Sequence, residues 1–129
     1  MYGERNPDRV TPVDRWVWGK VLRGRLTAMI VAFSISPTAG DETGSVSEAV
    51  AAAVRVVRES GLPHETNAMF TNIEGEWDEV MAVVKAAVEV VTAVSPRVGL
   101  VLKADIRPGF EGQMTAKVER LERALEKPR

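Results

Sequence analysis

The chain has 129 residues, enough for one hydrophobic core and one domain. Its net charge of −1 argues against a nucleic-acid partner, which normally meets a basic surface. The absence of cysteine and the single histidine exclude disulfides, thiolate metal sites and imidazole clusters, so no metal or cofactor is expected. No apolar run is long enough to span a membrane and no secretory signal is visible, so we expect a cytoplasmic protein.

Residues 1–27 differ from the rest of the chain. They contain five arginines, two prolines, and the tryptophans Trp16 and Trp18, without a sustained hydrophobic period. We expect a flexible N-terminal extension; the alternative is an arm that packs its tryptophans on a neighbouring subunit. The folded domain is then expected to cover residues 28–126.

The first half of this domain reads as a strand followed by a helix. Residues 28–36 alternate between apolar and smaller side chains, which predicts a strand with one face toward a core. Pro37 ends this strand. The spacing of Ser45 and Glu48 is typical of a capping box at a helix start. Gly61 closes the helix, because glycine is common just past a helix end.

The centre of the domain reads as a hairpin followed by a second helix. Residues 64–67 and 69–73 are both extended, with a turn near Asn67-Ala68. A sharp bend follows at Glu74-Gly75, where glycine avoids a side-chain clash. Acidic residues then occupy the first turn of a helix over residues 76–93, where the helix dipole stabilises them.

The last part of the domain reads as a strand and a final helix. Residues 97–106 alternate again, and Met114, Val118, Leu121 and Leu125 have the spacing of an amphipathic helix. The order strand, helix, strand, strand, helix, strand predicts an α+β, ferredoxin-like βαββαβ sandwich with an additional C-terminal helix.

One face of the predicted sheet is left without a helix. It carries Ile30, Phe70 and Val101 among polar residues, too many apolar groups for a surface in water. We expect a second subunit or the C-terminal helix to cover this face or its edge. A homo-oligomer is therefore predicted.

Six stretches resemble a known family of small thiamine-binding proteins with a ferredoxin-like fold. They are Ser45-Val-Ser-Glu48, Glu59-Ser-Gly-Leu62, Thr71-Asn-Ile-Glu-Gly-Glu-Trp-Asp-Glu79, Arg97-Val98, Lys103-Ala-Asp-Ile-Arg107 and Lys117-Val-Glu119. The resemblance extends over roughly residues 29–125. It implies binding of thiamine or a related hydroxymethylpyrimidine without catalysis, and self-association to a dimer or tetramer. Phe70 and Asn72 depart from the family pattern, which favours a small residue at the first position and an apolar one at the second.

The chemistry of thiamine suggests roles for six residues. Its aminopyrimidine needs hydrogen-bond donors and acceptors, and its cationic thiazolium favours a carboxylate or an aromatic face. The first need is met by hydroxyl or amide side chains, namely Ser34, Thr71 and Asn72. The second is met by Glu74 together with Phe70 or Trp77. These six form the predicted ligand-binding site.

Structural interpretations stand beside these roles. Glu74 is equally suited to cap the second helix or to pair with Lys103, and Thr71 to bond its own backbone. Trp77 is more often packed over a sheet, and His64 more often exposed or at an interface. Lys103, as part of the charged end of its strand, is also suited to an ion-pair group between subunits.

Two other classes of protein fit the same fold. One is an interaction or regulatory module whose open sheet face serves assembly only, without a small-molecule pocket. The other is a small enzyme such as an acylphosphatase, but the phosphate-binding loop and the arginine and asparagine that such an enzyme needs are not seen. We therefore predict a binding protein without catalytic residues.

Overall fold

The computed structural model describes residues 29–38 and 46–128. The predicted extension over residues 1–27 and the predicted capping residue Ser45 lie outside the described residues. The elements are β1 (Met29–Pro37), α2 (Ser47–Glu59), β2 (His64–Thr66), β3 (Thr71–Gly75), α3 (Trp77–Thr92), β4 (Val98–Ile106) and α4 (Gln113–Leu125). This order is the predicted βαββαβ succession with an added C-terminal helix.

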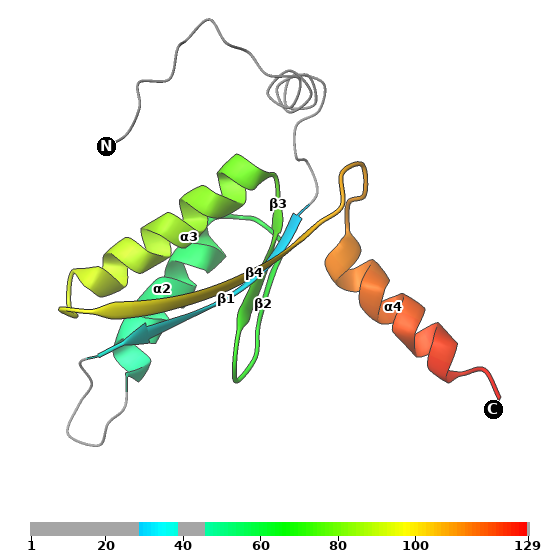
Figure 1. Cartoon of the computed structure of the whole chain (residues 1–129), viewed down its shortest axis with the longest axis horizontal. Helices are drawn as coiled ribbons and strands as arrows, with labels where there is room; N and C mark the ends of the chain where they lie inside the picture. The colour runs from blue at the N-terminus through cyan, green and yellow to red at the C-terminus, as the bar shows by residue number, and fades with distance from the viewer. Residues whose placement is uncertain (1–28, 39–45, 129) are drawn as a thin grey trace, which may run out of the picture.

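The four strands form one antiparallel sheet in the order β2-β3-β1-β4. The two helices α2 and α3 lie together on one face of this sheet (Figure 1). A four-stranded antiparallel sheet with both crossover helices on one side is the ferredoxin-like arrangement, so the predicted fold class is confirmed.

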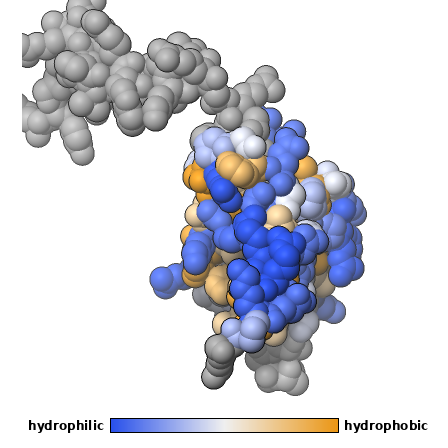
Figure 2. All heavy atoms as spheres, turned by 90° about the vertical axis from the view of Figure 1, so that its right-hand side faces the viewer, coloured by the Kyte–Doolittle hydropathy of each residue, from blue (hydrophilic) through white to orange (hydrophobic). Residues whose placement is uncertain are grey.

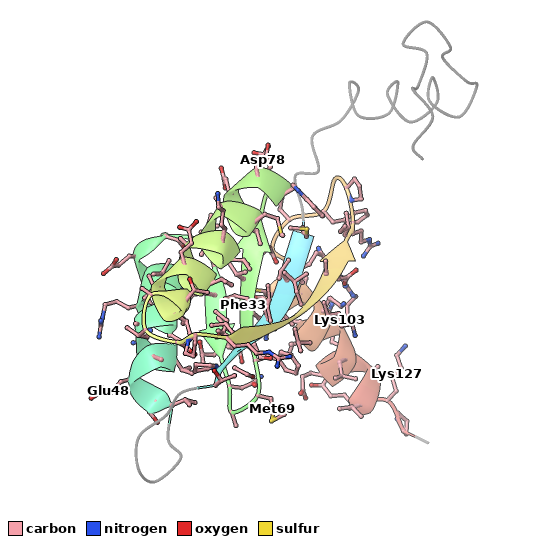
Figure 3. All side chains as sticks on the ribbon, turned by 60° about the vertical axis from the view of Figure 1, so that its left-hand side comes forward. Phe33, Glu48, Met69, Asp78, Lys103 and Lys127 are labelled. Atoms are coloured by element: carbon pink, nitrogen blue, oxygen red, sulfur yellow. The ribbon has the colours of Figure 1, made fainter. Side chains whose placement is uncertain are left out.

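The core lies between this face and the two helices. Met29, Val31 and Phe33 alternate along β1 and are buried, and Phe33 points from the sheet toward the helices (Figure 3). Ile73 of β3 joins them. The helices contribute small and β-branched side chains, namely Ala53, Val57, Val80, Val84, Ala87 and Val91. Packing of this stripe therefore offsets the low helix propensity of valine.

The hairpin between β2 and β3 turns where the sequence predicts it, but β3 begins at Thr71 rather than at residue 69. The side chain of Asn67 is the reason. Its Oδ1 accepts hydrogen bonds from the backbone N–H groups of Met69 and Phe70, each at 2.9 Å. An asparagine that bonds the backbone two and three residues onward holds those residues in a turn. The N–H groups of Met69 and Phe70 are therefore unavailable for strand pairing.

Two glycines lie at helix boundaries, each for a different physical reason. Gly61 follows α2 with φ +75°, the left-handed conformation that glycine adopts past a helix end. Gly75 has no positive φ. A Cβ atom at Gly75 would instead lie 3.2 Å from Cγ2 of Val80 and 3.4 Å from Cδ1 of Leu62. A Cβ atom at the bend before α3 would thus be packed more tightly than usual, so Val80 would have to shift, in agreement with the clash that the sequence predicts.

Gly75→Ala is therefore expected to lower the free energy of unfolding by about 1–3 kcal/mol, the usual cost of overpacking. The matched control is Gly99→Ala in β4, whose Cβ atom would meet Ser36 at an ordinary 3.7 Å. This control should be neutral or slightly stabilising because alanine restricts the unfolded chain. Urea denaturation of both variants measures the difference. Equal stability of the two variants would contradict the packing explanation.

The helix α4 leaves the sheet instead of covering it (Figure 1). Three apolar residues of its predicted stripe are exposed: Val118 (55%), Leu121 (58%) and Leu125 (69%). Seen from the side on which α4 lies, the surface is largely hydrophilic with hydrophobic residues between (Figure 2). Of the two predicted ways to cover the open face of the sheet, the one by α4 of the same chain is thus not observed. In the part of the chain that the structure describes, no helix has the length and hydropathy needed to cross a bilayer.

Candidate functional site

A cavity opens where β3 is shorter than β1. The strand β1 pairs with β4 as far as Pro37, but it pairs with β3 only from Met29 to Phe33. Beyond Phe33, the edge of β1 that faces the hairpin therefore has no strand partner among the described residues. The space beside this edge forms a cavity of about 300 Å³. Its size is at the lower end of the range of about 300–1,000 Å³ typical of small-molecule pockets.

Three segments enclose this hairpin cavity. They are residues 33–36 of β1, residues 66–71 of the hairpin, and three residues of α2, namely Val50, Ala53 and Val54. Met69 marks the tip of the hairpin in Figure 3. None of the described residues that line the cavity is charged. The position of the cavity thus follows from the early turn at Asn67, which ends the pairing between β1 and β3.

Hydroxyl groups supply most of the polar side chains in the cavity. Thr71 is buried, and its Oγ1 lies 3.2 Å from Oγ1 of Thr66 across the hairpin. Ser34 and Ser36 contribute two more hydroxyls from β1. The unpaired edge of β1 adds backbone N–H and C=O groups, which need partners when they are buried. Such a set suits a neutral, flat molecule with both donors and acceptors.

The carboxylate of Glu74 lies at the end of β3 away from the hairpin cavity. It bonds to the start of α4. Glu74 is only 7% exposed, and its two oxygens accept hydrogen bonds from the backbone N–H groups of Gln113 (3.1 Å) and Met114 (2.8 Å). The residue at the N-cap position of α4, Gly112, has no side chain for this purpose. Glu74 therefore caps α4 rather than α3.

A second contact holds α4 beside β4. The ammonium group of Lys117 forms an ion pair with Asp105 at 2.5 Å. The hydrogen bond from Lys117 lowers the pKa of the Asp105 carboxyl, and the charge of Lys117 lowers it further. Because the pKa of Asp105 is lowered, the pair stabilises the fold at pH values above the ordinary pKa of an aspartate. This stabilisation is lost as the pH falls through the lowered pKa.

Comparison with known proteins identifies the family. Residues 31–122 match the family model described as thiamine-binding protein. The chain belongs to this family. A UPF0045 protein of Mycobacterium bovis is 54% identical over 102 residues, which are 78% of this chain and 98% of that protein. The family that the sequence resembles is therefore confirmed.

Two solved structures agree with the fold. A hypothetical protein from Methanocaldococcus jannascii is 33% identical with a TM-score of 0.67, covering 74% of this chain and 96% of that one. A domain of unknown function from Bacillus cereus is 30% identical with a TM-score of 0.65, covering 75% of this chain and 93% of that one. The ferredoxin-like arrangement is thus shared with these two structures.

The structure brings together three of the six predicted ligand residues. Ser34, Phe70 and Thr71 line the hairpin cavity, so one of the two departures from the family pattern, Phe70, lies at the cavity itself. Asn72, the other departure, pairs with Ala32 of β1 and Glu65 of β2 on the face opposite the helices.

The remaining two predicted residues lie toward α3 and α4. Glu74 is three residues from Thr71 along a strand, or about 10 Å. Trp77 begins α3 and is 40% exposed, so it neither lines the hairpin cavity nor packs fully over the sheet. His64 is exposed, as the structural interpretation predicts, and its Nδ1 lies 2.8 Å from the Leu62 carbonyl oxygen.

Sequence reasoning missed three polar residues of the cavity, Ser36, Thr66 and Asn67. Two of them lie in the predicted hairpin. Thr66 pairs with Thr71 directly across the turn, and the turn itself was predicted at Asn67. A turn at Asn67-Ala68 alone would place Thr66 opposite Met69, so the pairing of Thr66 with Thr71 follows only from the four-residue turn of the structure.

Proposed function

We propose that this protein binds thiamine or a related hydroxymethylpyrimidine in the hairpin cavity, without catalysing a reaction on it. The observation that supports this most is the unpaired edge of β1 beside the hydroxyls of Thr66 and Thr71, within a cavity whose described lining residues carry no charge. Membership of the thiamine-binding family supports the same ligand class. The cytoplasm is the proposed location.

The aminopyrimidine is the part of the ligand that this site is suited to hold. An amino group beside a ring nitrogen offers a donor and an acceptor side by side, which is the pattern that a strand edge matches with its C=O and N–H groups. The hydroxyls of Ser34 and Thr71 supply further partners, and each can act as donor or acceptor. Phe33 and Phe70 provide aromatic surface for the ring.

The cationic thiazolium has a smaller part in this proposal. Glu74 is engaged with α4, which leaves Phe70 as the group suited to meet the positive charge, at about 0.5–1 kcal/mol for an exposed cation–π contact. Isothermal titration should therefore give thiamine and hydroxymethylpyrimidine dissociation constants within about tenfold of each other. Failure of both to bind a folded protein would contradict the proposal.

Thr71→Val tests the site with nearly unchanged shape. It removes the buried hydroxyl and leaves Thr66 without its partner, so we expect hydroxymethylpyrimidine affinity to fall by about 3- to 10-fold, the usual worth of a hydrogen bond. The matched control is Thr115→Val on the exposed part of α4. Isothermal titration of both variants measures the effect. Equal affinities in the two variants would remove Thr71 from the site.

Self-association is a second proposed function, and the exposed apolar surface favours it. In addition to the α4 stripe, the edge strand β4 exposes Leu100 (44%), Val101 (58%) and Ile106 (42%). Exposed apolar residues that gather on neighbouring elements are more often part of an interaction site than of the free surface of a monomer. We propose that a second copy of the chain covers them in a dimer or tetramer. If assembly were the whole function, protein concentration alone, and neither ligand, would raise the unfolding temperature.

A further inference from the structure

A second cavity, of about 230 Å³, lies at the opposite end of β1 from the hairpin cavity. Its base is formed by the start of β1, including Ile30, and its walls by the end of β4, the segment that follows β4, and α4. The charged side chains that line it are Glu74, Asp105, Arg107, Lys117 and Arg120. We refer to it as the α4 cavity.

The two carboxylates of the α4 cavity are already engaged. Glu74 accepts from two backbone N–H groups at the start of α4, and Asp105 is paired with Lys117. The helix N-terminus is thus occupied by a residue of the chain itself. Among the described residues, the charge that remains without a carboxylate partner in the cavity is positive and belongs to Arg107 and Arg120.

Both arginines keep donors available. The guanidinium of Arg107 lies 3.6 Å from the ring centroid of Phe110, a stacked position that leaves its N–H edge open. Arg120 donates one hydrogen bond, from Nη2 to Oε1 of Gln113 at 3.0 Å. Among the residues that the structure describes, neither arginine forms an ion pair. Guanidinium groups bind phosphate oxygens in a bidentate manner, more strongly than neutral partners do.

We propose that the α4 cavity binds a small organic phosphate. The phosphate group is held by Arg107 and Arg120, and the organic part lies against Ile30 and the ring of Phe110, which is 44% exposed. The apolar base distinguishes this site from a bare cationic patch, which would attract any anion. The site is separate from the hairpin cavity, and the proposal does not depend on thiamine binding.

The experiment is isothermal titration of the full chain with phenyl phosphate, inorganic phosphate and phenol. Phenyl phosphate should saturate one site per chain, inorganic phosphate should bind at least tenfold more weakly because it lacks the apolar part, and phenol should give no saturable heat. The affinity for phenyl phosphate should also fall as potassium chloride is raised, because exposed charges are screened. Equal binding of phenyl phosphate and phenol would overturn the proposal.

Variants locate the site. Arg107→Gln and Arg120→Gln should each weaken phenyl phosphate binding at least tenfold, whereas Arg55→Gln on the exposed side of α2 should leave it unchanged. Arg107→Lys keeps the charge but loses the planar fork, so intermediate affinity is expected. Unchanged affinity in both glutamine variants would overturn the proposal. Titration of the same variants with thiamine should show no change, which separates this site from the proposed function.

Discussion

Replacing Glu74 by alanine is expected to free the first turn of α4 from the sheet. The substitution leaves the N–H groups of Gln113 and Met114 without their acceptors, and hydrogen bonds to a charged group stabilise by about 1.5–3 kcal/mol. Loss of a helix cap alone costs about 0.5–2 kcal/mol. We therefore expect α4 to open more easily by about 2–3 kcal/mol. Amide hydrogen exchange at Gln113 and Met114 measures this local opening.

Two controls define the role of Glu74 more narrowly. Glu74→Gln retains one acceptor oxygen and should give about half of the effect, because the charge near the helix start is lost. Glu79→Ala, an exposed acidic residue in the first turn of α3, should leave exchange in α4 unchanged. If Glu74→Ala exchanged at the same rate as the parent chain, the cap would not stabilise α4.

The same variant separates the cap from a ligand role. Glu74 lies away from the hairpin cavity, so Glu74→Ala should bind thiamine and hydroxymethylpyrimidine as the parent chain does. Loss of thiamine affinity with unchanged pyrimidine affinity would instead indicate that the carboxylate contacts the thiazolium.

Leu121→Asp is expected to dissociate the proposed assembly. Leu121 is 58% exposed in a single chain and lies in the middle of the apolar stripe of α4, between Val118 and Leu125. A charge placed in a buried apolar contact costs several kcal/mol unless it finds a partner. A loss of that size is sufficient to shift a micromolar dimer to monomer at ordinary protein concentrations. Sedimentation velocity of the parent chain and the variant measures the change.

The control for this experiment introduces aspartate on the opposite side of α4. Arg123→Asp, two positions along α4, faces away from the apolar stripe by helical geometry and should leave the sedimentation coefficient unchanged. A parent chain that is monomeric at every concentration would contradict the assembly. Dissociation by both variants would indicate a general charge effect instead of an interface at Leu121.

Much of the fold follows from local patterns that act within one element. The alternation along β1, with Met29, Val31 and Phe33 inward, fixes its face toward the helices. Gly61 marks the end of α2 through its own left-handed conformation. Such signals are readable in a single sequence because the physical cause lies within a few residues of the effect.

The cap on α4 could not be predicted in the same way. Glu74 and its partners are 39 and 40 residues apart, and nothing in the local sequence links them. A carboxylate beside a predicted site suggested a partner for a cationic ligand, but the chemistry of the residue alone cannot distinguish a ligand from a helix start. Only the position of α4 relative to β3 decides between them.

The hairpin cavity was predictable in part. The types of Ser34, Phe70 and Thr71 pointed to a ligand site, and all three line one cavity. The size and place of the cavity depend on β3 beginning later than predicted, which the side chain of Asn67 causes through two hydrogen bonds. A difference of two residues in a strand boundary therefore decides whether the edge of β1 is paired or available.

Binding in the hairpin cavity can be located by titrating the isotope-labelled protein with hydroxymethylpyrimidine and following the amide resonances in two-dimensional NMR spectra. We expect saturable shifts concentrated in residues 34–36 and 66–71, with the amides of Gln113 and Met114 unaffected. Shifts concentrated at the start of α4, or none in either region at saturating ligand, would contradict binding in the hairpin cavity.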